Sequence, residues 1–149
     1  MEYFAYSQKS FVYKYVVMLS DTDQFKHMSF ANYLKLMFLA TDALFISCLN
    51  ANFLSRNRLR LMNSRMQFKK QTVAGDSILI KVNSSEISSS GFSLLHTFVI
   101  EGSGELVGLG RQTYQLLSYL DQSVKELPDS VSALLGPIGV EESHLLYKY

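Results

Sequence analysis

Two carboxylates and a histidine stand directly before one of the most apolar stretches of the chain. Asp21, Asp23 and His27 fall within seven residues, in the polar segment SDTDQFKHMS. A carboxylate near the first N–H groups of a helix could activate water or attack a carbonyl carbon, while those N–H groups stabilise the oxyanion. The alternative is that Asp21 or Asp23 caps a turn with its own side chain. The residues alone leave both interpretations of Asp23 open.

Other chemistries have little support in the sequence. No second histidine or cysteine lies at metal-ligand spacing, and we expect neither a metal ion nor another cofactor. The serines lack the Gly-x-Ser-x-Gly elbow of a Ser-His-Asp hydrolase. The formal net charge of +1 lacks the basic footprint of a nucleic-acid-binding protein. The one cysteine, Cys48, cannot form an internal disulfide, and its apolar helical surroundings predict that it is buried.

A long helix is predicted directly after the acidic segment. From Phe30 to Cys48 the apolar residues recur at helical spacing, without glycine or proline. Ser29 is the expected N-cap. Apolar residues fill most faces of this helix, so we expect protein to surround it. Its length and the charges of Lys35 and Asp42 argue against a membrane span, which needs about 20 apolar residues.

Strand patterns lie on both sides of the helix. The aromatic and β-branched run 11–19 predicts one strand before it. After a polar stretch at 50–58, four strands are predicted at 59–68, 77–82, 92–101 and 106–120, joined by short glycine and serine turns. Within 59–68, alternation places Met62, Ser64, Met66 and Phe68 on one face. A short helix is predicted at 128–136.

These elements predict a single α+β domain over residues 1–149. Short turns imply antiparallel pairing, and a long apolar helix among such strands indicates a curved sheet wrapped around a central helix. Such a sheet has exposed edges, which a second copy could cover. Hydrophobic residues make up 48% of the chain, enough for a sizeable core. No secretory signal is visible, so a cytoplasmic protein is expected.

The motifs around the helix resemble those of the hotdog-fold thioesterases of the 4-hydroxybenzoyl-CoA thioesterase type. The matching residues are Asp21-Thr22-Asp23, then Phe30-Ala31-Asn32-Tyr33 at the family's spacing, and later the segment FKKQTVAGDSILI. The resemblance covers roughly residues 11–120. The segment VKELPDSVSALL looks most like the thioesterases that accompany iterative polyketide and polyunsaturated fatty acid synthases.

One loop residue departs from the family pattern. Lys26 stands where the family usually holds glycine, the residue that adopts φ > 0 most readily. Part of the synthase-associated branch also carries asparagine in place of Asp23 and arginine in place of Thr41. With Asp23 the chain resembles the CoA-thioesterase branch.

The resemblance implies a hotdog fold and an acyl thioesterase that hydrolyses acyl-CoA or acyl-carrier-protein thioesters to a free fatty or polyketide acid. Asp23 would then be the general base or the nucleophile, and Asp21 would hold the loop through backbone N–H groups. The implied assembly is a homo-oligomer, a dimer or tetramer, with the site at the subunit boundary. Two alternatives share the fold: a hotdog dehydratase and a non-catalytic acyl-binding or assembly module.

Further candidate binding residues surround the matched motifs. For the substrate they are His27, Phe30, Asn32, Tyr33, Asn63 and Ser64. For the phosphates of CoA or phosphopantetheine they are Lys69, Lys70 and Arg111. Each has a structural alternative, because an exposed loop histidine, a packed tyrosine and solvated basic residues are all common in folded proteins.

An apolar stripe along the helix indicates the kind of acyl group. Leu34, Met37, Phe38, Thr41 and Phe45 lie along one side at helical spacing. Apart from Thr41 the stripe is apolar, so we expect a medium or long acyl chain rather than a charged or hydroxylated aromatic group. The alternative is that the stripe forms only core.

Overall fold

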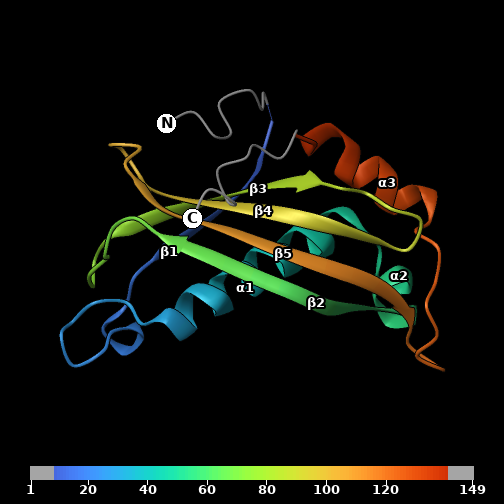
Figure 1. Ribbon diagram of the computed structural model, residues 1–149, viewed down its shortest axis with the longest axis horizontal. Helices are drawn as coiled ribbons and strands as arrows, with labels where there is room; N and C mark the ends of the chain where they lie inside the picture. Colours follow the sequence, from blue (N-terminus) through green and yellow to red (C-terminus); the bar gives the residue numbers. More distant parts are fainter. Residues whose placement is uncertain (1–8, 141–149) are drawn as a thin grey trace.

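Five antiparallel strands form one curved sheet in the computed structural model, which describes residues 9–140 (Figure 1). The strands are β1 (Phe11–Val16), β2 (Asn57–Phe68), β3 (Ser77–Ser85), β4 (Gly91–Ile100) and β5 (Leu106–Ser118). Their order in the sheet is β1-β3-β4-β5-β2. Residues 1–8 and 141–149 of the predicted domain lie outside the described residues. The first of these ranges contains most of the N-terminal segment for which no secretory signal was predicted.

Helix α1 (Phe30–Cys48) lies in the hollow of the sheet and has the predicted bounds. Ser29 is its N-cap, although the serine side chain makes no cap hydrogen bond. Its inward face is buried against the sheet; the buried residues are Tyr33, Leu36, Met37, Ala40, Thr41, Leu44 and Phe45. The predicted curved sheet around a central helix is therefore confirmed, and the two apolar faces form one core.

A β-bulge in β2 overturns the predicted alternation of that strand. The register against β5 pairs Leu61 with Tyr114 and then Asn63 with Thr113, so Met62 is the extra residue. Because one inserted residue reverses which side chains face inward, Leu61 packs on the core before the bulge and Met66 packs on it afterwards. Met62 does not share a continuous face with Ser64, Met66 and Phe68 as predicted.

The smaller elements differ from the predictions in three places. The first strand ends at Val16, and a 3-10 turn, η1 (Leu19–Asp21), follows it. The polar stretch contains an unpredicted helix, α2 (Ala51–Arg56), whose N-cap Asn50 accepts a hydrogen bond from Phe53 N at 2.8 Å. The predicted short helix is present as α3 (Asp129–Leu135), followed by η2 (Gly136–Ile138).

One prediction about α1 requires correction, and the apolar composition of the helix requires an explanation. Cys48 is exposed at the last residue of the helix, where its side chain points away from the core. By length and composition alone, α1 is also long and apolar enough to cross a membrane. Its position inside the sheet accounts for that composition, because a core helix surrounded by protein satisfies the same criterion.

Candidate active site

The loop between β1 and α1 is anchored by Asp21. Its Oδ2 accepts hydrogen bonds from Tyr15 Oη at 2.6 Å and from Met18 N at 2.8 Å. The hydrogen bond from Tyr15 to Asp21, together with the negative charge of Asp21, raises the pKa of Tyr15 to about 12. The carbonyl oxygen of Asp21 accepts from Ser29 N at 3.1 Å and from Asn32 Nδ2 at 2.7 Å. The predicted structural role of Asp21 is confirmed.

A tight turn then places Asp23 beside His27. The backbone of Asp23 donates to His27 O at 2.9 Å, and Lys26 N donates to Asp23 O at 2.9 Å. Lys26 closes the turn with φ +64°, in the left-handed region that favours glycine. The lysine therefore adopts the backbone conformation for which the family pattern uses glycine.

The carboxylate of Asp23 combines a structural contact with an open oxygen atom. Its Oδ1 accepts hydrogen bonds from Phe25 N at 2.8 Å and His27 N at 3.3 Å, which is the turn-capping arrangement. No residue within 9–140 donates a hydrogen bond to its Oδ2, and the side chain is exposed. One oxygen therefore orients the carboxylate while the other can accept a proton or attack a carbonyl carbon.

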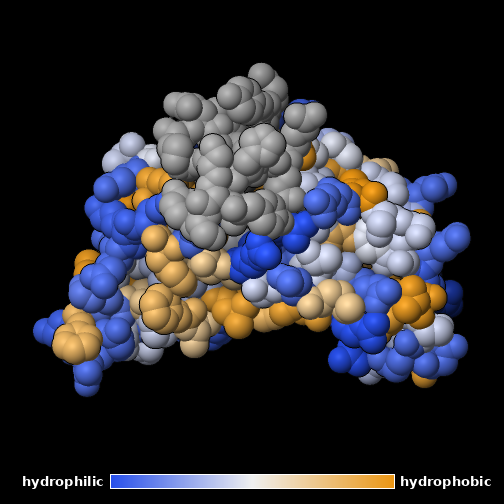
Figure 2. Space-filling view, in the orientation of Figure 1, coloured by the Kyte–Doolittle hydropathy of each residue, from blue (hydrophilic) through white to orange (hydrophobic). Residues whose placement is uncertain are grey.

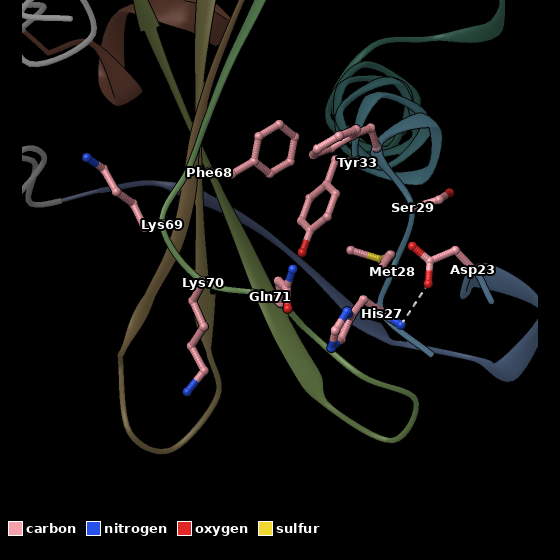
Figure 3. A pocket seen from close by; sticks show the side chains of 10 residues that line it. Asp23, His27, Met28, Ser29, Tyr33, Phe68, Lys69, Lys70 and Gln71 are labelled. Carbon is pink, nitrogen blue, oxygen red and sulfur yellow. Dashed lines mark hydrogen bonds between the residues drawn. The ribbon is translucent and has the colours of Figure 1, made fainter. Parts of the chain in front are cut away.

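A cavity of about 300 Å³ lies next to this carboxylate (Figure 3). It is lined by Asp23, His27, Met28, Ser29, Phe30, Tyr33, Phe68, Lys69, Lys70 and Gln71. Aromatic rings form one wall, with the Phe68 ring centroid 4.6 Å from that of Phe30 and 5.0 Å from that of Tyr33. The cavity thus combines a carboxylate with an apolar surface, as an acyl thioester requires.

Four lining residues were missed by the sequence reasoning. Met28 and Ser29 belong to the loop, while Phe68 is the last residue of β2 and Gln71 follows that strand. The two segments meet because Met28 N donates to Thr72 O at 2.9 Å and residues 27 and 73 form a β-bridge. The sequence did contain a signal for Phe68 and Gln71, because both belong to the segment FKKQ, which opens the second family-like motif.

Tyr33 reaches past the cavity into the protein. Its hydroxyl is hydrogen-bonded to Thr72 Oγ1 at 2.9 Å, and its ring also contacts Phe98 edge-on. Burial raises the pKa of Tyr33. The hydroxyl is therefore engaged inside the protein, and the cavity meets mainly the ring.

The two lysines border the cavity but extend outward from it in Figure 3. Lys70 Nζ lies 2.7 Å from Glu105 Oε1, in an exposed ion pair. Such a pair contributes at most about 1 kcal/mol to stability, so an incoming phosphate could compete with Glu105 for this lysine.

The remaining candidates lie outside the cavity. Asn32 uses its amide on Asp21 O, as described. Asn63 and Ser64 are exposed in the middle of β2, where Ser64 Oγ accepts a weak hydrogen bond from Gln112. Arg111 is buried on β5 and pairs with Glu86 at 2.6 Å, and strand alternation turns it away from α1. The fold therefore separates Arg111 from Lys69 and Lys70.

The amino-terminal end of α1 supplies backbone donors beside the cavity. The first N–H groups of a helix have no intrahelical acceptor, and no backbone acceptor from residues 9–140 meets Phe30 N or Ala31 N. Together with Asp23, this geometry can hold a carbonyl group near a carboxylate and donors for an oxyanion. Within the described chain, no group of histidine, cysteine, aspartate and glutamate side chains could hold a metal ion.

Comparison with known proteins adds a family match. The family model described as the thioesterase-like superfamily matches residues 17–135. A search of curated proteins finds no significant match to the sequence. The family match begins directly after β1 and covers the site and all later elements up to the end of α3.

Solved structures with the same fold include several thioesterases. The 1,4-dihydroxy-2-naphthoyl-CoA thioesterase from Synechocystis has 20% sequence identity and a TM-score of 0.77, over 86% of this chain and 96% of that chain. The dynemicin thioesterase has 18% identity and a TM-score of 0.82, over 89% and 99%. A gentisyl-coenzyme A thioesterase has 23% identity and a TM-score of 0.73, over 83% and 98%. Identities this low establish the shared fold alone.

Proposed function

The chain belongs to the thioesterase-like superfamily and is a thioester hydrolase, and on that premise we propose that it hydrolyses acyl-CoA or acyl-carrier-protein thioesters to a free fatty or polyketide acid. The observation that carries this proposal is the open Oδ2 of Asp23 in an aromatic-walled cavity at the start of α1. Structural relatives named for CoA thioesters support the CoA form of the substrate.

In the first mechanism, Asp23 is the general base. Its carboxylate removes a proton from water as the water oxygen attacks the thioester carbon, and the oxyanion accepts hydrogen bonds from the N–H groups at the start of α1. The tetrahedral intermediate then expels the thiolate, which takes the proton from Asp23. The hydrogen bonds from Phe25 N and His27 N hold the carboxylate in position throughout.

In the second mechanism, Asp23 is the nucleophile. Its Oδ2 attacks the thioester carbon, the thiolate leaves, and a mixed anhydride remains until water hydrolyses it. Incorporation of ¹⁸O into Asp23 during a single turnover in labelled water would identify this second mechanism. Attack of water on the aspartyl carbon of the anhydride would place ¹⁸O in Asp23, whereas direct attack of water on the thioester places all of the label in the product acid.

The carrier group would extend along the lysine side of the cavity. Lys69 and Lys70 border the cavity opposite the loop that carries Asp23, as Figure 3 shows. Their charges suit the phosphates of CoA or of phosphopantetheine. Arg111 lies elsewhere and has no part in this arrangement.

The functional unit would be a homo-oligomer with a dimer as its minimal form. β2 is an edge strand of the described sheet, and exposed apolar residues lie on α1 and β2. They are Phe30, Leu34, Ile46, Met62 and Phe68. Figure 2 shows apolar side chains gathered in a band along the lower side of the molecule, over the region where Figure 1 draws α1 and β2. Pairing with a second copy would cover both the edge and the band.

Replacing Asp23 with asparagine tests the proposed function most directly. Asparagine retains an oxygen that can accept from Phe25 N and His27 N, so Asp23→Asn preserves the turn while it removes the base or nucleophile. Thiol release from acyl-CoA and acyl-carrier-protein panels is expected to fall about a hundredfold or more in kcat/KM. The matched control is Asp129→Asn, on α3, which should retain wild-type rates.

Asp23→Ala removes the turn contact as well as the charge. It should lose the same activity and also lower the free energy of unfolding by about 1 kcal/mol. If Asp23→Asn retained full turnover while Asp23→Ala lost it, Asp23 would be only a turn cap.

A further inference from the structure

Two rows of residues cross the space between the sheet and α1. In the first row, Gly108 of β5 pairs with Phe98 and Phe68, whose rings both contact Tyr33 of α1. In the second row, two residues further along β5, Gly110 pairs with His96 on β4 and Met66 on β2. The first row borders the cavity through Tyr33 and Phe68, so the second row is the next layer inward.

Flexible methionine side chains fill the space above the two glycines. A methyl group built on Gly110 would collide with Sδ of Met37 and lie 3.3 Å from Sδ of Met66. One built on Gly108 would lie 2.5 Å from Cε of Met66. Glycine inside a strand often marks a place where another group approaches the backbone closely. At Gly110 that group is a pair of thioethers with several rotatable bonds each, which can move aside at modest cost.

His96 borders the same space and has an unused ring nitrogen. The residue is fully buried, and its Nε2 lies 3.2 Å from Thr41 Oγ1. Its Nδ1 is also buried and has no hydrogen-bond partner among residues 9–140. Burial lowers the pKa of His96 to about 3, against the smaller opposing effect of a hydrogen bond to the backbone of Met37, so the ring is neutral. A buried polar atom without a partner destabilises the protein, and a ligand atom that forms the missing hydrogen bond would recover that free energy.

The chemistry of a neutral imidazole selects the ligand group. If Nε2 accepts from Thr41, then Nδ1 carries the hydrogen and donates; if Nε2 donates, then Nδ1 accepts. A hydroxyl group satisfies either tautomer because it both donates and accepts. A plain methylene satisfies neither.

We propose that the acyl tail of the substrate passes inward from the cavity, displaces the side chains of Met37 and Met66 above Gly110, and presents a hydroxyl group to Nδ1 of His96. This inference rests on the proposed function, since the tail is that of the thioester. It assigns a hydroxylated medium-chain acyl group as the preferred substrate, with His96 determining the position of the hydroxyl.

The spacing of the rows limits where the hydroxyl lies. Two residues along a strand span about 6.6 Å, so the hydroxyl group should lie about five carbons beyond the point where the tail passes Phe68. A set of hydroxydecanoic acids with the hydroxyl at different carbons therefore scans the site, with decanoic acid as the reference.

Calorimetric binding of these acids tests the inference without requiring turnover. The wild-type protein should bind one hydroxy isomer about tenfold more tightly than decanoic acid, equivalent to about 1.4 kcal/mol. His96→Phe should abolish the preference and leave decanoic acid within about threefold. His96→Gln, which retains a donor and an acceptor, should restore part of it. Equal affinity for all isomers in the wild type, or an unchanged preference in His96→Phe, overturns the inference.

A variant of Gly110 provides a second test, which does not depend on His96. Gly110→Ala should weaken binding of every ten-carbon acid about tenfold, because its methyl group occupies the path of the tail. Gly136→Ala is the matched control, since a methyl group there meets no atom within 4 Å. Equal binding by Gly110→Ala and the control would contradict the path.

Met66→Ala keeps the inference testable if the His96 variants do not fold. Met66 is only partly buried, so the protein should tolerate the change. Decanoic acid should bind at least threefold more tightly because one side chain fewer must be displaced. Unchanged or weaker binding contradicts the displacement.

Hydrolysis rates separate this inference from the proposed function. Wild-type kcat/KM should be highest for the CoA thioester of the preferred hydroxy isomer. If thioesters are hydrolysed with a flat profile across isomers, the inference fails and the function stands. If the hydroxy preference and its loss in His96→Phe appear in binding while no thioester is hydrolysed, the function fails and the binding path stands.

Discussion

The side-chain amide of Asn32 donates a hydrogen bond to the carbonyl oxygen of Asp21, with 2.7 Å between Nδ2 and O. The bond joins the first turn of α1 to the turn η1, and it closes the loop that carries Asp23. Asn32 was a candidate for substrate binding, but its contact explains the residue without a substrate. The proposed active site therefore depends on a residue that does not touch its cavity.

We predict that Asn32→Ala lowers the free energy of unfolding by about 1 kcal/mol, because Asp21 O loses a partly buried donor. It should also lower kcat through displacement of Asp23. Denaturant titration and thiol-release assays measure the two effects. The control is Asn52→Ala on the exposed face of α2. Loss of activity without any loss of stability would instead favour direct contact of Asn32 with substrate.

Lys26→Gly should stabilise the protein slightly. A non-glycine residue at φ +64° costs about 1–2 kcal/mol. Glycine has greater freedom in the unfolded chain, which cancels about 0.5–1 kcal/mol of the gain from replacing the lysine. The expected gain is up to about 1 kcal/mol, measured by chemical denaturation. Gln24→Gly, in the same loop but without a positive φ, should instead lose stability. Equal losses in both variants would show that the Lys26 side chain matters more than its backbone.

Acid should destabilise the protein through His96. Its pKa is about 3 in the folded protein and about 6.5 in the unfolded chain. Because the folded value is the lower one, the neutral ring contributes stability fully above pH 6.5, and that contribution is lost as the pH falls toward 3. The loss should be on the order of a few kcal/mol.

His96→Gln should remove this part of the acid dependence, so its free energy of unfolding should fall less between pH 6.5 and 3. Thr97→Val, a neutral change on the same strand, is the control and should keep the wild-type slope. Parallel pH profiles for the wild type and His96→Gln would show that the ring does not stay neutral in the folded protein.

The assembly should depend on the exposed band of α1. Ile46 is 64% exposed on that helix, and Ile46→Glu would place a charge in the interface expected between copies. Light scattering at micromolar concentration should give a dimer or tetramer mass for the wild type and a smaller mass for the variant. Ile87→Glu, on the turn between β3 and β4, is the control. A monomeric wild-type protein would contradict the proposed oligomer.

Local sequence signals were sufficient where one periodic pattern ran without interruption. The bounds of α1 were predicted correctly because nineteen residues keep helical spacing without glycine or proline. The six-residue α2 was missed because it is shorter than two helical turns, too short for an apolar period, so its only signal was the cap Asn50. The bulge at Met62 was missed because alternation on either side of it looks continuous in the sequence.

Tertiary placement could not be obtained from such signals. Cys48 occupies a helical position that looks apolar, yet its exposure depends on where the helix ends relative to the sheet. Arg111 alternates onto the face opposite α1, away from the lysines that follow β2. Motif spacing identified Asp23, while the contribution of Phe68 and Gln71 to the same cavity required the pairing of distant segments.

The strand order has a consequence for the way the chain is made. β1 and β2 are consecutive in sequence but occupy opposite edges of the sheet, and β2 pairs only with β5 in the described sheet. During synthesis α1 therefore emerges before four of the five strands of the sheet, and the last of these ends at Ser118. Distant pairings of this kind fold slowly. The apolar helix at the centre of the finished protein is thus the segment of the nascent polypeptide most in need of chaperone protection.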